Sequence, residues 1–154
     1  MSDIQIKEYE ALILKKSNRE KAEYGQQLVQ LLGGTPGPLG PDGGIDGWYV
    51  SPDGGETVYF QVKLSRSAVS RDLVRLIRQT CSDHGSTKAI LISVQNLSAV
   101  ARKYVERHGD SFSLCHVRIA DILTAKHYAR LREAGFDEAK SLADKLTGAL
   151  QALG

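Results

Sequence analysis

The chain has 154 residues, of which 42% are hydrophobic and 25% are charged, and its formal net charge at pH 7 is +2. This length suits one domain with a buried core, and a net charge so close to zero does not by itself favour any class of partner. No run of about 18 apolar residues occurs, and the first ten residues, MSDIQIKEYE, lack an apolar leader, so we expect neither a membrane span nor a signal peptide.

The N-terminal part of the chain predicts one clear helix after an ambiguous segment. Within residues 4–16 the apolar residues first alternate as in a strand and then fit a short helix. A helix is predicted from Ser17, because Ser17 and Glu20 have the spacing of a capping box, and it ends at Gly33-Gly34. Its predicted apolar stripe consists of Tyr24, Leu28, Leu31 and Leu32.

The rest of the chain alternates predicted strands and helices after a loop rich in glycine and proline. That order predicts an α/β fold with a three-layer core, in which helices flank a central mixed β-sheet, plus C-terminal helices. We divide the chain into a core, residues 1–123, and a C-terminal helical extension, residues 124–154, which packs on the core or at a dimer interface. The predicted elements are a loop at 35–44, strands at 45–50, 57–64, 88–94 and 113–119, and helices at 70–83, 98–108, 121–132 and 137–153.

The first two predicted strands form a hairpin whose register depends on its turn. A two-residue turn at Asp53-Gly54 places Asp46 opposite Gln61, and a turn at Gly54-Gly55 places Asp46 opposite Lys63. In both registers these three polar side chains share one face of the hairpin, since side chains alternate along a strand. The opposite face would carry Ile45, Tyr49, Val58, Phe60 and Val62.

The three polar residues of the hairpin permit a specific chemistry. The carboxylate of Asp46, the amide oxygen of Gln61 and the backbone carbonyl of Val62 are hard oxygen ligands that suit Mg²⁺. A lysine beside such a metal, here Lys63, can stabilise the charge that develops on a phosphoryl group. The same residues also fit an ordinary strand with an exposed polar face, and the three residues alone do not decide between these interpretations.

The segment GGIDG followed by a hairpin and Gln61-Val62-Lys63 resembles the PD-(D/E)XK nuclease superfamily, especially its Mrr-like restriction endonuclease branch. The resemblance extends over the segments LVQLLGG, SRDLVRLIRQ and KAILISV and fades after Asp121. It implies a restriction-endonuclease-like fold and an endonuclease that hydrolyses DNA with Mg²⁺ or Mn²⁺ in restriction or phage defence. It further implies that Asp46 and Gln61 bind the metal and that Lys63 is the catalytic lysine, with Asp42 as the fallback for Asp46.

One position departs from the pattern of this superfamily. The first helix often carries a glutamate that adds a metal ligand, and the corresponding residue here is Gly25. Its loss predicts weaker metal binding. Two alternatives therefore stay open: a catalytically weakened DNA-binding module of the same fold, and a resolvase-like enzyme that acts on branched or damaged DNA.

Arginines follow the hairpin and suggest how an anionic polymer would bind. Residues 63–78 carry five basic side chains and one acidic one, Asp72. Guanidinium groups grip phosphate oxygens, so we expect phosphate contacts here, although a solvated helix face is the alternative. The residues predicted to bind DNA are Arg66, Arg71, Arg75 and Arg78.

The remaining expectations concern location and partners. Cys81 and Cys115 lie in no metal-binding spacing, so we expect two buried, reduced thiols in a cytoplasmic protein. DNA is the expected main partner. Cleavage of both strands of a duplex needs two active sites, which makes a homodimer plausible. The resemblance adds a methyltransferase or another defence protein as a possible partner.

Overall fold

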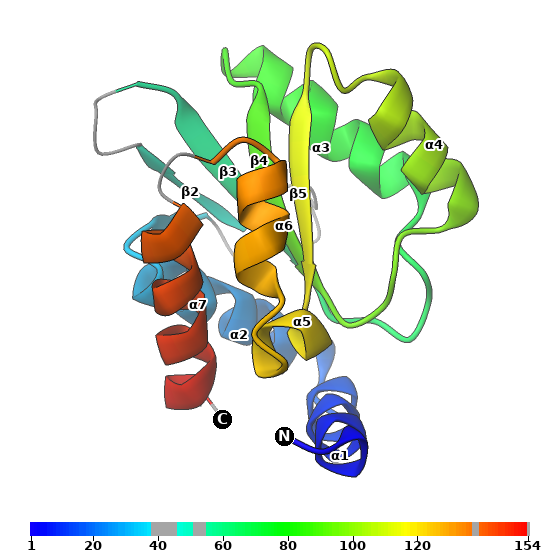
Figure 1. Ribbon diagram of the computed structural model, residues 1–154, viewed down its shortest axis with the longest axis vertical. Helices are drawn as coiled ribbons and strands as arrows, with labels where there is room; N and C mark the ends of the chain where they lie inside the picture. The colour runs from blue at the N-terminus through cyan, green and yellow to red at the C-terminus, as the bar shows by residue number, and fades with distance from the viewer. Residues whose placement is uncertain (38–45, 51–54, 137–138, 154) are drawn as a thin grey trace.

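The computed structural model describes residues 1–37, 46–50, 55–136 and 139–153 and shows a β-sheet with helices on both faces (Figure 1). The sheet has the strand order β1-β2-β3-β4-β5, in which β1, β2 and β3 pair antiparallel and β3, β4 and β5 pair parallel. The elements are α1 (Asp3–Leu14), α2 (Asn18–Leu31), β1 (Thr35–Pro36), β2 (Gly47–Val50), β3 (Thr57–Lys63), α3 (Arg71–Asp83), β4 (Lys88–Ser93), α4 (Ala99–Arg107), β5 (Ser113–Arg118), α5 (Ile119–Leu123), α6 (His127–Glu133) and α7 (Ala139–Leu153).

The helices form one layer on each face of the sheet. A larger hydrophobic cluster joins the sheet to α2, α5, α6 and α7, and a smaller one joins it to α3 and α4. Figure 1 shows α6 and α7 on the near side of the strands and α3 on the far side. The predicted three-layer α/β fold with a mixed sheet is therefore confirmed. Within the described ranges, every helix is too short or too polar to cross a lipid bilayer.

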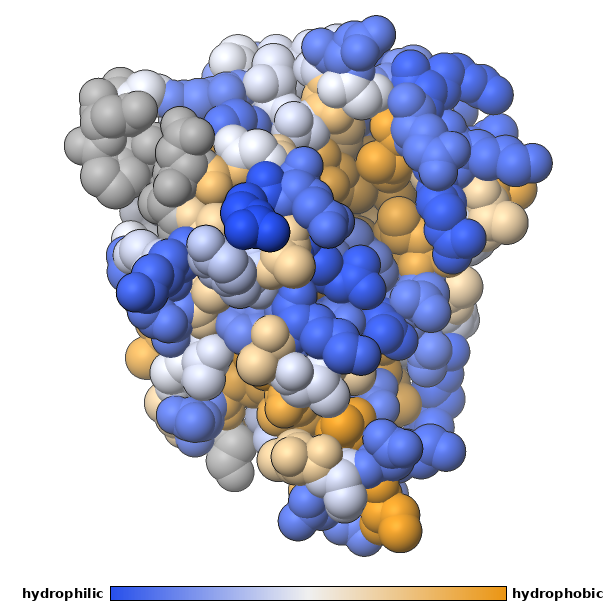
Figure 2. All heavy atoms as spheres, in the orientation of Figure 1, coloured by the Kyte–Doolittle hydropathy of each residue, from blue (hydrophilic) through white to orange (hydrophobic). Residues whose placement is uncertain are grey.

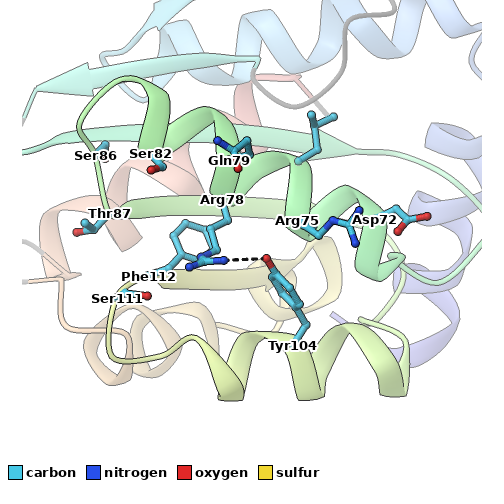
Figure 3. A pocket seen from close by; sticks show the side chains of 11 residues that line it. Asp72, Arg75, Arg78, Gln79, Ser82, Ser86, Thr87, Tyr104, Ser111 and Phe112 are labelled. Atoms are coloured by element: carbon cyan, nitrogen blue, oxygen red, sulfur yellow. Dashed lines mark hydrogen bonds between the residues drawn. The ribbon is translucent and has the colours of Figure 1, made fainter.

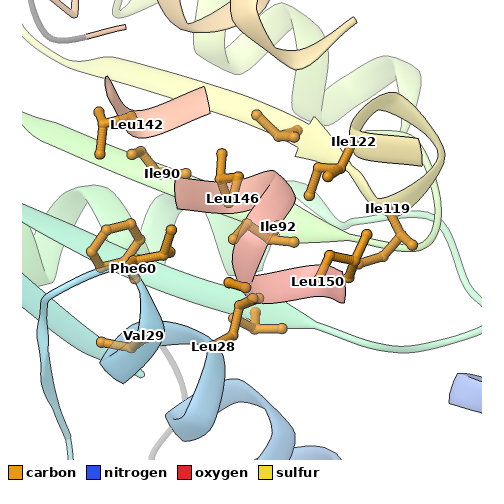
Figure 4. Close-up of a cluster of buried hydrophobic side chains, with 14 of the residues drawn as sticks. Leu28, Val29, Phe60, Ile90, Ile92, Ile119, Ile122, Leu142, Leu146 and Leu150 are labelled. Carbon is orange, nitrogen blue, oxygen red and sulfur yellow. The ribbon is translucent and has the colours of Figure 1, made fainter. Parts of the chain in front are cut away.

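The larger cluster brings together residues that are far apart in the sequence. Leu28 of α2, Phe60 of β3 and Ile92 of β4 have no exposed surface and lie in one cluster with Leu146 of α7 (Figure 4). Full burial of a side chain of this size contributes about 1.5–3 kcal/mol relative to its exposed state. The apolar stripe predicted for the last helix is confirmed, because all five of its residues are buried: Ala139, Leu142, Ala143, Leu146 and Leu150.

The helix α7 thus shares the hydrophobic core of α2 and the sheet. The space-filling view of the same side shows that apolar and hydrophilic side chains mix over these helices (Figure 2). A hollow of about 650 Å³ opens there between α4 and α6, alongside the edge strand β5. The division of the chain at residue 123 stays a prediction.

The two cysteines lie on opposite faces of the sheet. Cys81 belongs to the cluster beneath α3 and α4, and Cys115 belongs to the larger cluster. Both are buried and form no disulfide. Burial raises the pKa of each thiol to about 12, so both stay protonated at neutral pH.

The ambiguous N-terminal segment is a helix, α1, and it begins with a capping box. The Ser2 hydroxyl accepts from the backbone N–H of Gln5 at 3.3 Å, and the Gln5 side chain accepts from the N–H of Ser2 at 2.8 Å. The capping box predicted for α2 is confirmed by the same pair of bonds between Ser17 and Glu20, at 3.1 and 2.9 Å. The spacing Ser2-x-x-Gln5 was therefore a signal that decides the first segment in favour of a helix.

Two predictions near the end of α2 are wrong. Leu31 is 46% exposed, whereas Val29 is fully buried, because the stripe that faces the sheet runs through Gly25, Leu28 and Val29 rather than Leu31. The segment predicted as a loop begins with a short strand, β1, which pairs with β2. β1 extends the sheet by one strand next to the start of β2.

The prediction of a single helix over residues 121–132 is also wrong. α5 begins earlier, because the Asp121 carboxylate accepts from the backbone N–H of Arg118 at 2.9 Å and so occupies the third position of the helix. The chain then leaves the helical conformation at Ala125, whose φ is 59°, before α6 starts. Five further predicted elements are confirmed to within one residue at each end, namely β3, α3, β4, α4 and β5.

The hairpin register follows the first of the two predicted alternatives. Trp48 pairs with Tyr59 and Tyr49 pairs with Val58, as a turn at Asp53-Gly54 requires. Tyr49 faces the larger cluster, where its ring lies 5.4 Å from that of Phe60. Residues 51–54 themselves lie outside the described part of the chain.

Candidate active site

The strands β2 and β3 separate at Asp46. We call this place, with Asp46, Gln61, Val62 and Lys63, the fork. Gly47 is the register partner of Phe60, but the backbone N–H of Asp46 also donates to the Phe60 carbonyl, at 2.7 Å. Two consecutive residues thus lie opposite one, which is the arrangement of a β-bulge. The prediction that Asp46 lies opposite Gln61 or Lys63 is therefore wrong, although the register holds from Gly47 onward.

Gly47 explains why the chain departs at this point. A Cβ atom at this position would lie 2.5 Å from the backbone oxygen of Thr35 and 2.5 Å from a methyl group of Val29. A side chain cannot fit there, so β1 and α2 pack directly on the backbone of Gly47. This close packing fixes where β2 begins and hence where Asp46 lies.

The backbone of Val62 organises the fork. Along a strand, the backbone N–H and C=O groups of every second residue point to the same neighbouring strand. Those of Phe60 point to β2, so those of Val62 also point to the β2 side of β3. The Asp46 carboxylate accepts from the Val62 N–H at 2.5 Å, and the Val62 carbonyl accepts from Nε2 of Gln61 at 3.3 Å. The structure thus brings Asp46, Gln61 and Val62 together, by backbone contacts that the predicted register did not include.

Asp46 has an unusual pKa for an aspartate. Burial raises the pKa of its carboxyl group to about 6, against the lowering effects of the Val62 N–H and the Lys63 ammonium. Lys63 is therefore close enough to interact electrostatically with Asp46. A carboxyl group with a raised pKa beside a cation is typical of functional sites, because a structural aspartate more often has a lowered pKa.

Gly25 of α2 faces the Asp46 carboxylate directly. A Cβ atom on Gly25 would lie 3.6 Å from both Cγ and Oδ1 of Asp46 and 3.4 Å from Cβ of Val62. A glutamate at this position would start at van der Waals distance from the carboxylate. Position 25, where related nucleases often carry a glutamate, therefore lies in the site, and this chain has no side chain there.

The oxygen atoms at the fork suit a hard divalent cation. The Asp46 carboxylate and the Val62 carbonyl present oxygens, and rotation of the Gln61 amide would add its own. The raised pKa of Asp46 fits this interpretation, since a cation would favour the charged carboxylate. Among the described residues, no group of three or more histidines, cysteines, aspartates or glutamates could hold a metal. The metal-binding roles stay predictions.

The side chains of Gln61 and Lys63 differ in exposure. Gln61 is buried, at 7% exposure, whereas Lys63 is exposed at the end of β3. This difference suits a buried ligand and an ammonium group that a substrate can reach. The fallback residue Asp42 lies outside the described residues, as does Ile45.

The predicted DNA-binding arginines separate into two places. Arg66 is exposed in the segment between β3 and α3. The other three lie on α3, where Arg71 and Arg75 are exposed and Arg78 is half-buried and donates to the Tyr104 hydroxyl of α4 at 3.1 Å. The packing of α3 on α4 thus links these arginines to residues some 30 positions further along the chain.

Two basic residues of α4 were missed by the sequence analysis. Lys103 and Arg107 lie in a groove, the α3–α4 groove, which is lined by Arg71, Arg75, Val100, Lys103, Tyr104 and Arg107. The signal was present, because Lys103 and Arg107 have the i, i+4 spacing that places them on one face of the predicted helix. What the sequence did not show was that this face meets α3.

Comparison with known proteins yields one family match. A model of the Mrr catalytic domain family, described as a restriction endonuclease, matches residues 13–123. The match includes the fork, Gly25, and the helices α3 and α4. Neither the curated proteins nor the solved structures contain a significant match to the chain.

Proposed function

Because the chain belongs to the Mrr-type restriction endonuclease family, we propose that it is an endonuclease that hydrolyses DNA phosphodiester bonds with Mg²⁺ or Mn²⁺. The observation that supports this proposal most strongly is the Asp46 carboxyl group, which is half-buried, has a pKa of about 6 and interacts with Lys63. Such a group is unfavourable in the metal-free protein and becomes favourable when it binds a cation.

Each residue of the fork has a distinct role in this proposal. Asp46, the Val62 carbonyl and the Gln61 amide oxygen hold the metal, which supplies Lewis acidity and lowers the pKa of a bound water. The Val62 N–H fixes the orientation of the Asp46 carboxylate. The exposed ammonium of Lys63 contacts the phosphate and stabilises the negative charge that develops on its oxygens.

A plasmid assay with matched lysine variants tests the proposal. Supercoiled plasmid is incubated with wild-type protein, Lys63→Ala, or Lys140→Ala, a control in the exposed part of α7, each with and without Mg²⁺ or Mn²⁺. We expect metal-dependent nicking by the wild type and the control and a loss of at least about a hundredfold for Lys63→Ala, because stabilisation of the transition-state charge is lost. Equal nicking by Lys63→Ala and the wild type would show that the active site does not lie at the fork.

A second candidate function is supported by Gly25. A site with one carboxylate binds a divalent cation less tightly than a site with two, since affinity depends on the number of charged ligands. The alternative is therefore a DNA-binding module that keeps the fold and has lost cleavage. It predicts retardation of DNA on a gel that weakens as salt rises, with no nicking at any metal concentration. Junction and linear duplex substrates in the same assay separate a resolvase-like activity from an ordinary endonuclease.

We extend the proposal to the biological setting of the enzyme. Membership of a restriction endonuclease family supports a role in restriction or phage defence. In this setting the chain acts in the cytoplasm, as a homodimer that cuts both strands or together with a methyltransferase or another defence protein. Sedimentation of the purified chain, alone and with duplex DNA, tests the dimer.

A further inference from the structure

The α3–α4 groove lies on the face of the sheet opposite α2 and α7. Its volume is about 230 Å³, and it shares Arg75 and Tyr104 with a wider hollow of about 750 Å³ between α3 and residues 86–87 and 111–112. Figure 3 shows Arg75 and Arg78 projecting from α3 towards this hollow and Tyr104 facing them from α4. The two cavities adjoin at these two residues, and we call them together the channel.

Positive charge along this channel exceeds the one acid, Asp72, among its lining residues. Arg71 and Arg75 on α3 and Lys103 and Arg107 on α4 are all exposed. Nη2 of Arg71 lies 4.0 Å from Oδ1 of Asp72. Within the described residues, no other of these four cations forms an ion pair. Like charges placed along facing helices repel one another, so the arrangement is stabilised when an anion binds between them.

Two further contacts show that the charge is concentrated rather than dispersed. The Arg78 guanidinium donates to the Tyr104 hydroxyl, which holds a fifth cation beside the channel. The His108 ring packs on Tyr104 at 4.4 Å, and its pKa is lowered, first by burial and then by repulsion from Arg78 and Arg107. The two positive neighbours thus add to the effect of burial in disfavouring protonation of His108.

The channel starts at the end of the sheet that carries the fork. α3 follows β3 after a short connection, and the bridge between Val69 and Leu97 holds the starts of α3 and α4 side by side. Arg71 lies in the first turn of α3 and is therefore the groove cation nearest in sequence to Lys63. A polymer that passes Lys63 can enter the channel from this end.

The lining of the channel indicates which part of a nucleic acid it binds. Tyr104 and Phe112 are at most 8% exposed, so neither offers a ring on which a base could stack. The charged groups that line the groove are guanidinium and ammonium groups, which contact phosphates and carry no sequence information. We propose that the α3–α4 groove binds the phosphodiester backbone of the nucleic acid to one side of the scissile bond, an inference that rests on the proposed nuclease function.

The test compares two sets of three charge removals. The groove variant is Arg75→Ala/Lys103→Ala/Arg107→Ala, and the control is Arg132→Ala/Lys140→Ala/Lys145→Ala, which removes three exposed cations from α6 and α7. Binding of a labelled single-stranded oligonucleotide and of the matching duplex is measured without divalent cations over a range of KCl concentrations. A third variant, Arg75→Lys/Arg107→Lys, keeps the charge and controls for loss of packing.

We expect the groove variant to bind at least about tenfold more weakly at low salt, with a salt dependence shallower by about 2 in the log–log plot for the single strand. The control and the lysine variant should bind like the wild type. Loss with the single strand alone identifies a single strand as the occupant, loss with the duplex alone identifies duplex DNA, and loss with both probes shows that the groove binds the backbone of either form. Binding by the groove variant that equals the control would overturn the proposal.

The plasmid assay separates this inference from the proposed function. If wild-type protein nicks plasmid through Lys63 while the groove variant binds DNA normally, the groove proposal fails and the nuclease stands. If the wild type never nicks plasmid while the groove variant loses binding, the groove binds nucleic acid and the catalytic proposal fails.

Discussion

The fork and the α3–α4 groove both concentrate charge, but they do so in opposite environments. At the fork the Asp46 carboxyl group is half-buried and the structure shifts its pKa, whereas Arg75, Lys103 and Arg107 remain exposed in the groove. Burial makes a charge chemically selective, because few partners can satisfy it, while exposed charges attract any polyanion. The comparison suggests that the fork provides chemistry and the groove provides affinity.

The substitution Asp46→Asn removes the negative charge from the fork and is expected to have the largest effect. We expect nicking to fall at least about a hundredfold, because the one carboxylate at the predicted metal site is lost. The metal-free protein should become more stable at pH 8, by about 1–3 kcal/mol, because the buried charge disappears. Nicking rates and urea unfolding measure the two effects. Normal nicking by Asp46→Asn would mean that another carboxylate binds the metal.

The pH dependence of the wild type gives a second test of the fork. Because the pKa of Asp46 is raised from 3.8 to about 6 in the folded chain, its contribution to stability is present below pH 4 and is lost as pH rises through 6. Metal binding has the opposite dependence, since it needs the carboxylate, and should weaken about tenfold from pH 7 to pH 5. Calorimetric metal titrations at both pH values measure it, and a flat profile would contradict the assigned pKa.

A substitution at Gly25 can increase the metal affinity of the fork rather than abolish it. Gly25→Glu adds a second carboxylate beside Asp46, so the metal concentration for half-maximal nicking should fall about tenfold, while the metal-free protein loses stability through like-charge repulsion. Gly25→Ala is the control, which should stabilise α2 by up to about 1 kcal/mol without tightening metal binding. If the alanine variant tightens metal binding as much as the glutamate variant, the added ligand is not the cause.

The smallest expected effect belongs to the groove. Tyr104→Phe removes the hydroxyl that accepts from Arg78 and leaves the ring in place. We expect the free energy of unfolding to fall by about 1 kcal/mol and DNA binding to change less than about threefold, because the guanidinium keeps its charge. A large loss of binding would show that the position of Arg78, and not the summed charge, determines affinity.

Much of the fold was predictable because local signals agree with the tertiary structure. The Ser17–Glu20 capping box, the apolar strand that begins at Lys88 and, from Gly47 onward, the first of the two predicted hairpin registers appear in the structure. The displacement of Asp46 was not predictable, since it depends on contacts of Gly47 with Thr35 and Val29, which come from other elements. The regular pairing of antiparallel strands, continued by one residue beyond Gly47, would place Asp46 opposite Gln61.

In the candidate site, too, the sequence did not predict contacts between residues that are far apart along the chain. The residue types at the fork and the arginines of α3 could be identified from their spacing in the sequence. The contribution of Lys103 and Arg107 could not, because it requires knowledge of how α3 packs against α4. The break at Ala125, where φ is positive without a glycine, likewise has no signal in residue type.

The placement of the two cysteines gives each half of the molecule its own chemical probe. Cys81 lies under the groove helices and Cys115 lies in the cluster that α2 and α7 cover. Since both thiols are buried and protonated, an alkylating reagent modifies each one after its own layer opens. Mass spectrometry of the two cysteine peptides during slow alkylation would therefore reveal whether the layer of α3 and α4 and the layer of α2 and α7 unfold together or in sequence.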